Sequence, residues 1–262
     1  MAGSGSVQGD LWGSRAADWT FLQEPMGSLV WHTALRLGQV GNGTRFLDAG
    51  CGGGGASIVA AAHGARICGI DASRALVDVA RSRLPSARFE VGDLENLPFD
   101  DQSFDVALAS NSLQYTSSAK AALGEIRRVL APQGRLCMVQ WGPPELCQAA
   151  QAIFPALASI MPPSTGAANP LDLSVPESQD QVLKETRFGP IARQLADFPM
   201  EYASVEDAWR AQRSAGPIEG ACRAVGEPAV KQALTKALQP FVGVAGSVRL
   251  QNKFWIVVAA PT

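Results

Sequence analysis

A cluster of glycines that follows a short apolar run is the part of this sequence best suited to bind a ligand. Residues 46–55 read F-L-D-A-G-C-G-G-G-G, and the alanine-rich residues 56–63 behind them favour a helix. Glycine lets the backbone come close to a ligand because no Cβ stands in the way. The N-terminus of a helix offers free N–H groups and a positive dipole end to a carboxylate or a phosphate. The order of strand, glycine turn and helix is typical of a mononucleotide-binding unit.

The glycine spacing fits two kinds of cofactor site. Gly50, Gly52 and Gly55 satisfy G-x-G-x-x-G, the fingerprint of dinucleotide sites such as those of NAD-dependent dehydrogenases. Asp48 adds an acid and completes D-x-G-x-G-x-G, which resembles motif I of class I S-adenosylmethionine (SAM) methyltransferases. A carboxylate repels a pyrophosphate and attracts an ammonium or a sulfonium. Asp48 therefore favours the second cofactor, and a structural turn without a ligand is the third interpretation.

Acidic residues close the next two expected strands. Asp71 follows strand 66–70, and it lies about twenty residues beyond the glycines, where a carboxylate can bind the hydroxyls of an adenosine ribose. Its alternative role is the N-cap of the next helix, which Ser73 could supply instead. Asp93 follows strand 88–91, where a side-chain acceptor would meet an adenine amino group. Acids are also common in turns for structural reasons.

Five sequence blocks occur in the order and at the spacing of one family. They are D-A-G-C-G-G-G (48–54), G-I-D-A-S (69–73), G-D-L-E-N-L-P-F (92–99), F-D-V-A-L-A-S (104–110) and E-I-R-R-V-L-A-P-Q-G-R-L (125–136). Together they resemble the small-molecule class I SAM-dependent methyltransferases, the group that includes the ubiquinone and menaquinone biosynthesis methyltransferases. The resemblance implies an α/β fold with a Rossmann-like, seven-stranded, mostly parallel sheet, an antiparallel last strand, and helices on both faces.

The resemblance also implies S-adenosyl-L-methionine as the cofactor and S-adenosyl-L-homocysteine as its product. Asp48 and the glycines would lie near the methionine part, Asp71 at the ribose, and Asp93 with Leu94 at the adenine. The full set of expected cofactor-binding residues is Trp19, Asp48, Gly50, Cys51, Gly52, Asp71, Ala72, Asp93, Leu94 and Ser110.

An aromatic segment precedes the glycine motif. Residues 10–31 hold three of the six tryptophans, and Trp12 and Trp19 would share a face if they stood on one helix, although Gly13 argues against an unbroken helix. The tryptophans either pin an N-terminal helix to the core or form a lid over a cationic ligand, since indole faces attract cations. Residues 1–9 are rich in glycine and serine and are expected to be disordered.

Few side chains suggest acid–base chemistry. Many relatives carry a histidine pair after the fourth strand, whereas this chain has Gln114 and Tyr115. The catalytic candidates are Tyr115 and His32, and Glu24 is a further candidate for a base or a substrate contact. Methyl transfer from SAM is an in-line displacement, so it needs a base only where the acceptor holds its proton tightly. The sequence shows no cluster with metal-ligand spacing, so no metal is expected.

The composition changes after Trp141. Nine of the seventeen prolines lie between Pro143 and Pro199, which indicates an insertion that shapes a pocket. We expect residues 191–202 to form the sixth strand and residues 248–260 the last. The expected segments are an N-terminal lid (1–35), a SAM-binding core (36–142), a substrate-side insertion with the sixth strand (143–225), and the last helix and strand (226–262).

The composition also narrows the partners. The net charge is −2 and charged residues make up 18%, so no basic field suggests nucleic acid. No apolar run approaches the length of a membrane span. The first residues lack the features of a signal peptide, and five scattered cysteines favour a reducing cytoplasm. We therefore expect a cytoplasmic protein with a small-molecule substrate, and leave its oligomeric state open.

The resemblance and the composition together predict a methyltransferase that acts on O, N or C of a small, largely apolar or aromatic molecule. A secondary metabolite or a quinone-like ring would fit this description. Two alternatives keep the same scaffold. One is an enzyme that binds SAM without transferring its methyl group, such as a cyclase, isomerase or decarboxylase, and the other is a non-catalytic partner subunit.

Overall fold

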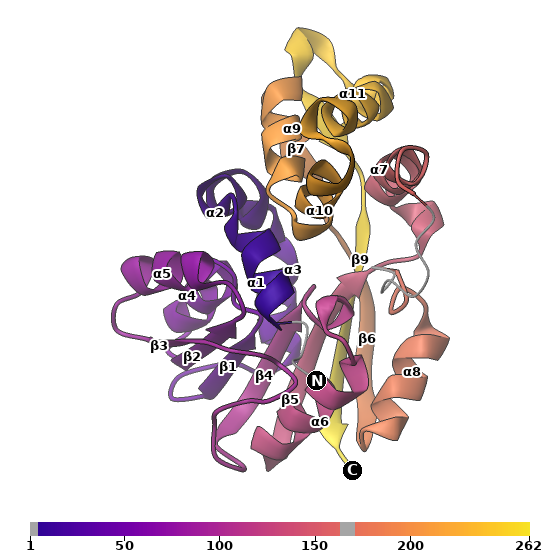
Figure 1. Cartoon of the computed structure of the whole chain (residues 1–262). Coiled ribbons are helices and arrows are strands. Elements are labelled where there is room, and N and C mark those ends of the chain that lie inside the picture. The colour runs from indigo at the N-terminus through magenta and orange to yellow at the C-terminus, as the bar shows by residue number, and fades with distance from the viewer. Residues whose placement is uncertain (1–4, 163–170) are drawn as a thin grey trace.

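A seven-stranded sheet organises the protein, whose computed structural model describes residues 5–162 and 171–262. Its strand order is β3-β2-β1-β4-β5-β9-β6. β9 (Lys253–Pro261) runs antiparallel to both of its neighbours and the other strands are parallel to one another, which confirms the predicted fold class (Figure 1). The parallel strands are β1 (Arg45–Ala49), β2 (Arg66–Asp71), β3 (Arg88–Val91), β4 (Phe104–Ser110), β5 (Leu130–Trp141) and β6 (Phe188–Asp197).

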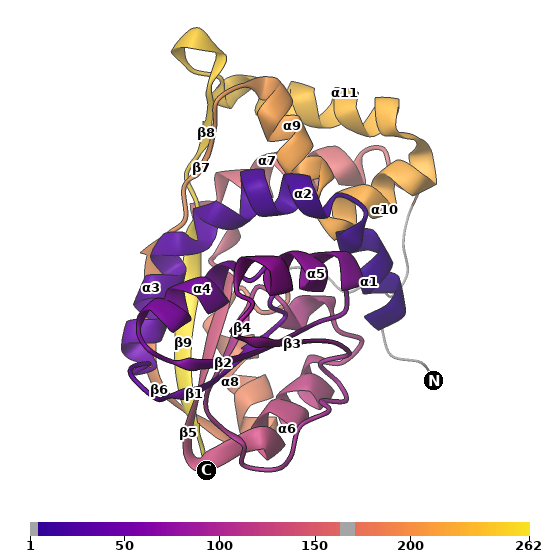
Figure 2. The ribbon, with the colours of Figure 1, turned by 90° about the vertical axis from the view of Figure 1, so that its left-hand side faces the viewer.

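Helices cover both faces of the sheet because its inner strands are apolar on both sides. In β1, Phe46 joins one core cluster and Leu47 the other, and both side chains are fully buried. One face carries α3 (Ser28–Leu37), α4 (Gly55–Ala62) and α5 (Arg74–Arg83), and the other carries α6 (Ala119–Val129) and α8 (Pro176–Glu185) (Figures 1 and 2).

A group of helices stands above the carboxyl ends of the strands (Figure 2). We call it the helical cap, and it consists of α7 (Gln148–Ala158), α9 (Val205–Arg213), α10 (Gly216–Val225) and α11 (Glu227–Leu238). A two-stranded ribbon of β7 (Met200–Tyr202) and β8 (Val248–Leu250) leads into it. The cap therefore comes from the part of the sequence that follows Trp141.

The expected sixth and last strands are each divided, which corrects the ranges 191–202 and 248–260. Their main parts belong to the large sheet, and the remainder forms the ribbon. Asn252 lies at the break and is 1% exposed. Its Nδ2 donates to the Phe198 carbonyl at 3.2 Å, and its Oδ1 accepts from the N–H of Ala149 at 2.9 Å. These bonds to the cap side satisfy the backbone where the sheet ladder stops.

The N-terminal segment is helical from Gly5 onward, so the expected disorder is wrong for residues 5–9, and residues 1–4 lie outside the described part of the chain. Trp12 and Trp19 do not share one helix, but their rings meet edge to face with centroids 4.8 Å apart. The elements in this segment are α1 (Gly5–Gly13), α2 (Ala16–Asp18), a π-helical turn (Trp19–Gln23) and a 3-10 turn (Glu24–Gly27).

α1 presents glycines to the loops that follow β2 and β3. The N–H of Gly5 donates to Oδ2 of Asp93 at 3.3 Å. A Cβ on Gly9 would overlap the carbonyl oxygen of Ala72, and a Cβ on Gly13 would lie 2.7 Å from Oγ of Ser73. The helix can therefore approach these loops closely only because its contact face lacks side chains.

Replacing Gly9 by alanine should displace α1 from these loops while the sheet stays folded. We expect faster amide hydrogen exchange over residues 5–13 and a Tm lowered by about 2–4 °C, the shift that corresponds to about 1 kcal/mol in a chain of this size. Gly124→Ala is the matched control, because nothing lies within 4 Å of its added Cβ in α6. That change should leave Tm unchanged or raise it. Equal exchange over residues 5–13 in both variants would contradict the docking of α1.

Candidate active site

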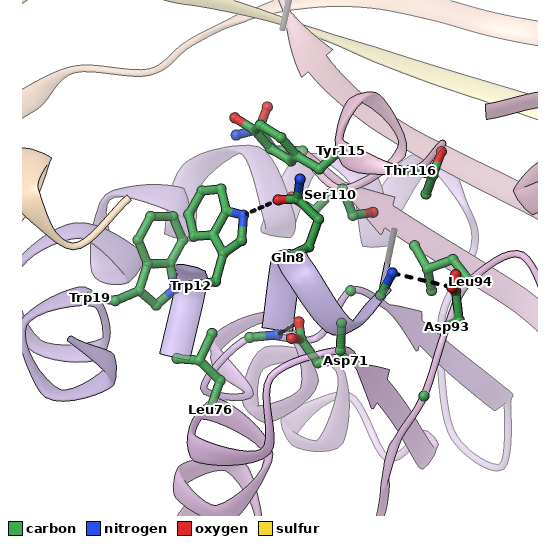
Figure 3. A pocket seen from close by; sticks show the side chains of 17 residues that line it. Gln8, Trp12, Trp19, Asp71, Leu76, Asp93, Leu94, Ser110, Tyr115 and Thr116 are labelled. Atoms are coloured by element: carbon green, nitrogen blue, oxygen red, sulfur yellow. Dashed lines mark hydrogen bonds between the residues drawn. The ribbon is translucent and has the colours of Figure 1, made fainter. Parts of the chain in front are cut away.

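A cavity opens at the carboxyl ends of β1, β2, β3 and β4, beside α1 (Figure 3). The order of the sheet reverses between β1 and β4, and ligands of open α/β sheets bind at such a reversal. Its empty volume, which includes open solvent at the mouth, is about 710 Å³. We call it the inner cavity, and eight of the ten predicted cofactor residues line it, namely Trp19, Gly50, Gly52, Asp71, Ala72, Asp93, Leu94 and Ser110.

The glycine turn brings bare backbone to the wall of the inner cavity. Gly50 has a φ of +87° and Gly52 a φ of +52°, in the left-handed region that glycine adopts without strain. A Cβ on Gly50 would also overlap the side chain of Ser112, whose hydroxyl donates to the Ala49 carbonyl at 2.7 Å. Both glycines are therefore needed for the shape of the turn as well as for access.

Asp71 joins the glycine turn to the end of β2. Its Oδ2 accepts from the N–H of Gly52 at 2.9 Å, and its Oδ1 accepts from the N–H of Ser73 at 2.8 Å. The N-cap of α5 is Ser73, whose hydroxyl accepts from the N–H of Leu76. Asp71 therefore does not serve as that cap. A carboxylate has about four lone-pair sites, so both oxygens can accept further bonds from a ligand.

Asp48 and Cys51 do not line the inner cavity, which separates them from the other predicted cofactor residues. Asp48 is 1% exposed and accepts from the hydroxyl of Ser57 at 2.6 Å. The Cys51 side chain packs with Val77 and other apolar groups beneath the turn, and burial raises the pKa of its thiol well above the usual range. Cys51 is therefore a close-packed residue of the turn. Any effect of Asp48 on a ligand acts through its charge.

His32 lies outside the site, so its prediction as a catalytic residue does not match the structure. It stands on α3 beside His63, with ring centroids 6.0 Å apart, and borders neither of the two cavities described here. Helix periodicity places it on the side of α3 opposite the buried Val30 and Ala34. In the described residues no group of three or more His, Cys, Asp and Glu side chains could hold a metal ion.

Glu24 lies directly over the glycine turn, a position that the sequence did not indicate. Its carboxylate forms an ion pair with Arg83 and accepts from the backbone N–H groups of Gly53 and Gly55. It is 5% exposed, and burial raises its pKa despite these partners. A residue that lies far ahead of the motif reaches it only through the fold of the N-terminal segment, so no local spacing could reveal the contact.

A second cavity adjoins the inner one. Its empty volume is about 860 Å³, and it lies between the end of β4, the N-terminal segment and the helical cap. We call it the outer cavity. Its wall is largely aromatic and aliphatic, with Trp31, Trp141, Phe154 and Phe254 among its residues. It shares Trp12, Trp19, Ser110, Asn111 and Tyr115 with the inner cavity.

Tyr115 stands where the two cavities meet. Its ring packs edge to face on Trp12 with centroids 5.0 Å apart (Figure 3). Burial raises the pKa of its phenol above the usual range, so the side chain stays neutral near pH 7. Tyr115 therefore gives both cavities an aromatic wall with a neutral hydroxyl, and its catalytic role stays a prediction.

None of the helices in residues 5–162 and 171–262 is long and apolar enough to cross a membrane. Trp209 in the helical cap is 4% exposed and belongs to the core. The aromatic wall of the outer cavity therefore comes from other residues, several of them on the N-terminal segment.

The central part of the chain is similar to known methyltransferases. Residues 47–138 match the family model of a methyltransferase domain. Over 38% of the chain, the protein is 36% identical to a malonyl-[acyl-carrier protein] O-methyltransferase from Serratia marcescens, and that match covers 39% of the relative. Over 53% of the chain, it is 31% identical to a demethylmenaquinone methyltransferase from Clavibacter sepedonicus, and that match covers 61% of the relative.

The chain thus spans less than two thirds of the length of these curated relatives. The solved structure of YcgJ from Bacillus subtilis has the same fold, with a TM-score of 0.60, 21% identity, and coverage of 88% of this chain and 98% of the other. The family model, the sheet with its antiparallel last strand and the glycine turn agree. Residues 47–138 therefore carry a methyltransferase domain, and S-adenosyl-L-methionine is the cofactor that its family uses.

Proposed function

We propose that this protein transfers the methyl group of SAM to an oxygen, nitrogen or carbon atom of a small, largely apolar or aromatic molecule. A secondary metabolite or a quinone-like ring fits this description. The observation that carries the proposal is the wall that the inner and outer cavities share at the end of β4. Methyl transfer requires donor and acceptor to meet in line, and two adjoining cavities provide one place for each.

The residues of the inner cavity fit SAM. Gly50 and Gly52 leave a cradle that a Cβ would partly fill. The free lone pairs of Asp71 suit two ribose hydroxyls, and Asp93 suits an adenine amino group. The backbone N–H of Leu94 has no partner among the described residues, so it can donate to an adenine ring nitrogen. We therefore assign the inner cavity to the cofactor.

The protein's own contribution is alignment and exclusion of water. SAM, when bound, supplies an electrophilic methyl group on a sulfonium. The faces of Trp12 and Trp19 attract cations, and the aromatic wall of the outer cavity keeps water from the acceptor. Glu24 and Tyr115 are the ionisable side chains that border the outer cavity in the described part of the chain. Tyr115 stays neutral, so Glu24 is the group that could accept a proton from an acceptor that needs a base.

Three carboxyl groups, two of them buried and that of Asp71 half-buried, surround the glycine turn and favour a cationic ligand there. Burial, together with the negative charges of Glu24 and Asp71, raises the pKa of Asp48 to about 7. Burial also raises the pKa of Asp71 and of Glu24. Carboxylates that repel one another are stabilised by a nearby ammonium or sulfonium, which suits SAM and disfavours a pyrophosphate.

The buried Asp48 makes stability depend on pH. Its pKa is higher in the folded than in the unfolded protein, so the folded state binds more protons and the free energy of unfolding falls as pH rises from about 4 to about 7. The Asp48→Asn variant lacks this loss. From pH 5 to pH 8, wild type should lose about 2–3 kcal/mol relative to the variant, and the difference should stay constant above pH 8. Urea unfolding at several pH values measures it, and parallel curves for the two proteins would contradict the raised pKa.

Asp71→Asn should weaken SAM binding about tenfold or more, because charge-assisted hydrogen bonds to the ribose become neutral ones. Asp78→Asn is the control, since Asp78 is an exposed residue on the neighbouring α5. Calorimetric titration with SAM and S-adenosylhomocysteine gives both affinities. Unchanged affinity in Asp71→Asn, or binding of NADH in place of SAM by the wild type, would remove Asp71 from the cofactor site.

Methyl transfer itself is tested with SAM that carries a labelled methyl group. The panel of acceptors contains phenols, hydroxyquinones, amines and carbon acids. It also contains malonyl-[acyl-carrier protein] and demethylmenaquinone, which appear in the names of the two curated relatives. We expect label in one class of product and an equal amount of S-adenosylhomocysteine. Conversion of an acceptor with SAM intact would support a cyclase, isomerase or decarboxylase instead. SAM binding without any product across the panel would contradict the proposed transfer.

A further inference from the structure

A buried polar chain of three residues borders the largely apolar outer cavity. Gln23 comes from the N-terminal segment, Tyr202 from β7 and Gln212 from α9, and their exposed fractions are 8%, 5% and 7%. Nε2 of Gln212 donates to the Tyr202 hydroxyl at 2.9 Å, and that hydroxyl donates to Oε1 of Gln23 at 2.8 Å. Both glutamines line the cavity. Tyr202 lies behind them and holds one end of each amide.

The hydrogen bonds leave one donor and one acceptor of this chain unused. In the arrangement above, the Gln23 amide nitrogen and the Gln212 amide oxygen have no partner in the described part of the structure. Turning both amides around gives an equally good chain, with Gln23 donating to Tyr202 and Tyr202 donating to Gln212. In that arrangement the Gln23 amide oxygen and the Gln212 amide nitrogen are the atoms without a partner. In either case one N–H donor and one carbonyl acceptor remain.

The single proton of the Tyr202 hydroxyl is the reason that one donor and one acceptor always remain free. Burial raises the pKa of this phenol above its usual range, so the hydroxyl keeps its proton and can donate only one bond. One glutamine must then accept that bond and the other must donate to the hydroxyl oxygen. Both glutamines line the cavity, and a ligand that displaces water from their free amide ends loses affinity unless it bonds to both of them.

The charge of the outer cavity limits which ligand this can be. No Lys, Arg or His lines it within the described ranges, and its carboxylate, Glu24, already bonds Arg83 and two backbone N–H groups. An anionic ligand would be buried there without a counter-charge, which is unfavourable. The aromatic wall suits a ring system. A hydroxyl group is both a donor and an acceptor, so it matches the two free amide ends.

We propose that Gln23 and Gln212, held by Tyr202, recognise a hydroxyl group on a neutral aromatic acceptor. Gln23 and Gln212 bind the hydroxyl, and Tyr202 is a positioning residue that sets the direction of their hydrogen bonds. The inference rests on the proposed function in assigning the outer cavity to the acceptor. It adds the chemical class of that acceptor, which is an uncharged aromatic compound that carries a hydroxyl.

The test compares three probes that share one ring system: 2-naphthol, naphthalene and 2-naphthoate. Equilibrium dialysis at pH 7.5 in the presence of S-adenosylhomocysteine measures the Kd of each. Wild type should bind 2-naphthol about fivefold to tenfold more tightly than naphthalene, the gain expected of hydrogen bonds in a buried site. It should bind 2-naphthoate most weakly, because the carboxylate finds no cation.

Two variants locate the selectivity. Gln212→Met should reduce the preference for 2-naphthol to about twofold or less, and Tyr202 can still donate to Gln23 in this variant. The triple variant Gln23→Met, Tyr202→Phe, Gln212→Met removes every member of the polar chain, so no buried group is left unpaired, and it should abolish the preference. Gln232→Met on an exposed position of α11 is the matched control and should retain the wild-type preference.

A preference that persists in the triple variant would overturn the inference, as would tighter binding of 2-naphthoate than of 2-naphthol, or no binding of any probe. SAM titration of each variant is measured in parallel and should give the wild-type affinity. The dialysis requires no turnover, so it is independent of the methyl-transfer assay. Failure of transfer with the selectivity intact would remove the proposed function alone, and transfer without the selectivity would remove this inference alone.

Discussion

The close packing of bare backbone at the turn after β1 is the constraint on which the site depends. The turn reverses direction at the point where the strand order of the sheet reverses, and it must pass Ser112 on one side and Glu24 on the other. Side chains at Gly50 or Gly55 would overlap Ser112 or Trp31. The Asp71 carboxylate holds the turn by accepting from Gly52. The wall of the inner cavity follows from these contacts.

The N-terminal segment completes the walls of both cavities, so it is an integral part of the fold. α1 lies against the loops after β2 and β3, and Glu24 lies on the glycine turn. On its other side the segment meets the helical cap through ion pairs such as that of Asp18 with Arg210 at 2.5 Å. Exposed pairs of this kind contribute little stability. Close packing of Trp12 against Gly216 gives the contact its shape.

The two cavities differ in the charged groups near them, and this difference is the basis of their different proposed roles. Carboxylates gather around the glycine turn, and burial raises their pKa values, so a cation is favoured in the inner cavity. The outer cavity offers aromatic rings and two amide ends that the protein does not use. Burial of a neutral, partly polar ring system is therefore favourable there, because its apolar surface leaves water and its polar group can find partners.

The sequence by itself determined the fold class and eight of the residues that line the inner cavity. A glycine turn needs glycine at left-handed positions, and acids at strand ends meet at one edge of a parallel sheet, so Asp71 and Asp93 could be placed from local patterns. Only the tertiary structure decided that Asp48 and Cys51 lie beneath the glycine turn and that Glu24 lies over it. It also decided that His32 lies away from both cavities. It also brought Gln23, Tyr202 and Gln212 together. Those three residues come from distant segments, and contacts of that kind depend on how the N-terminal segment and the helical cap pack, which no local spacing encodes.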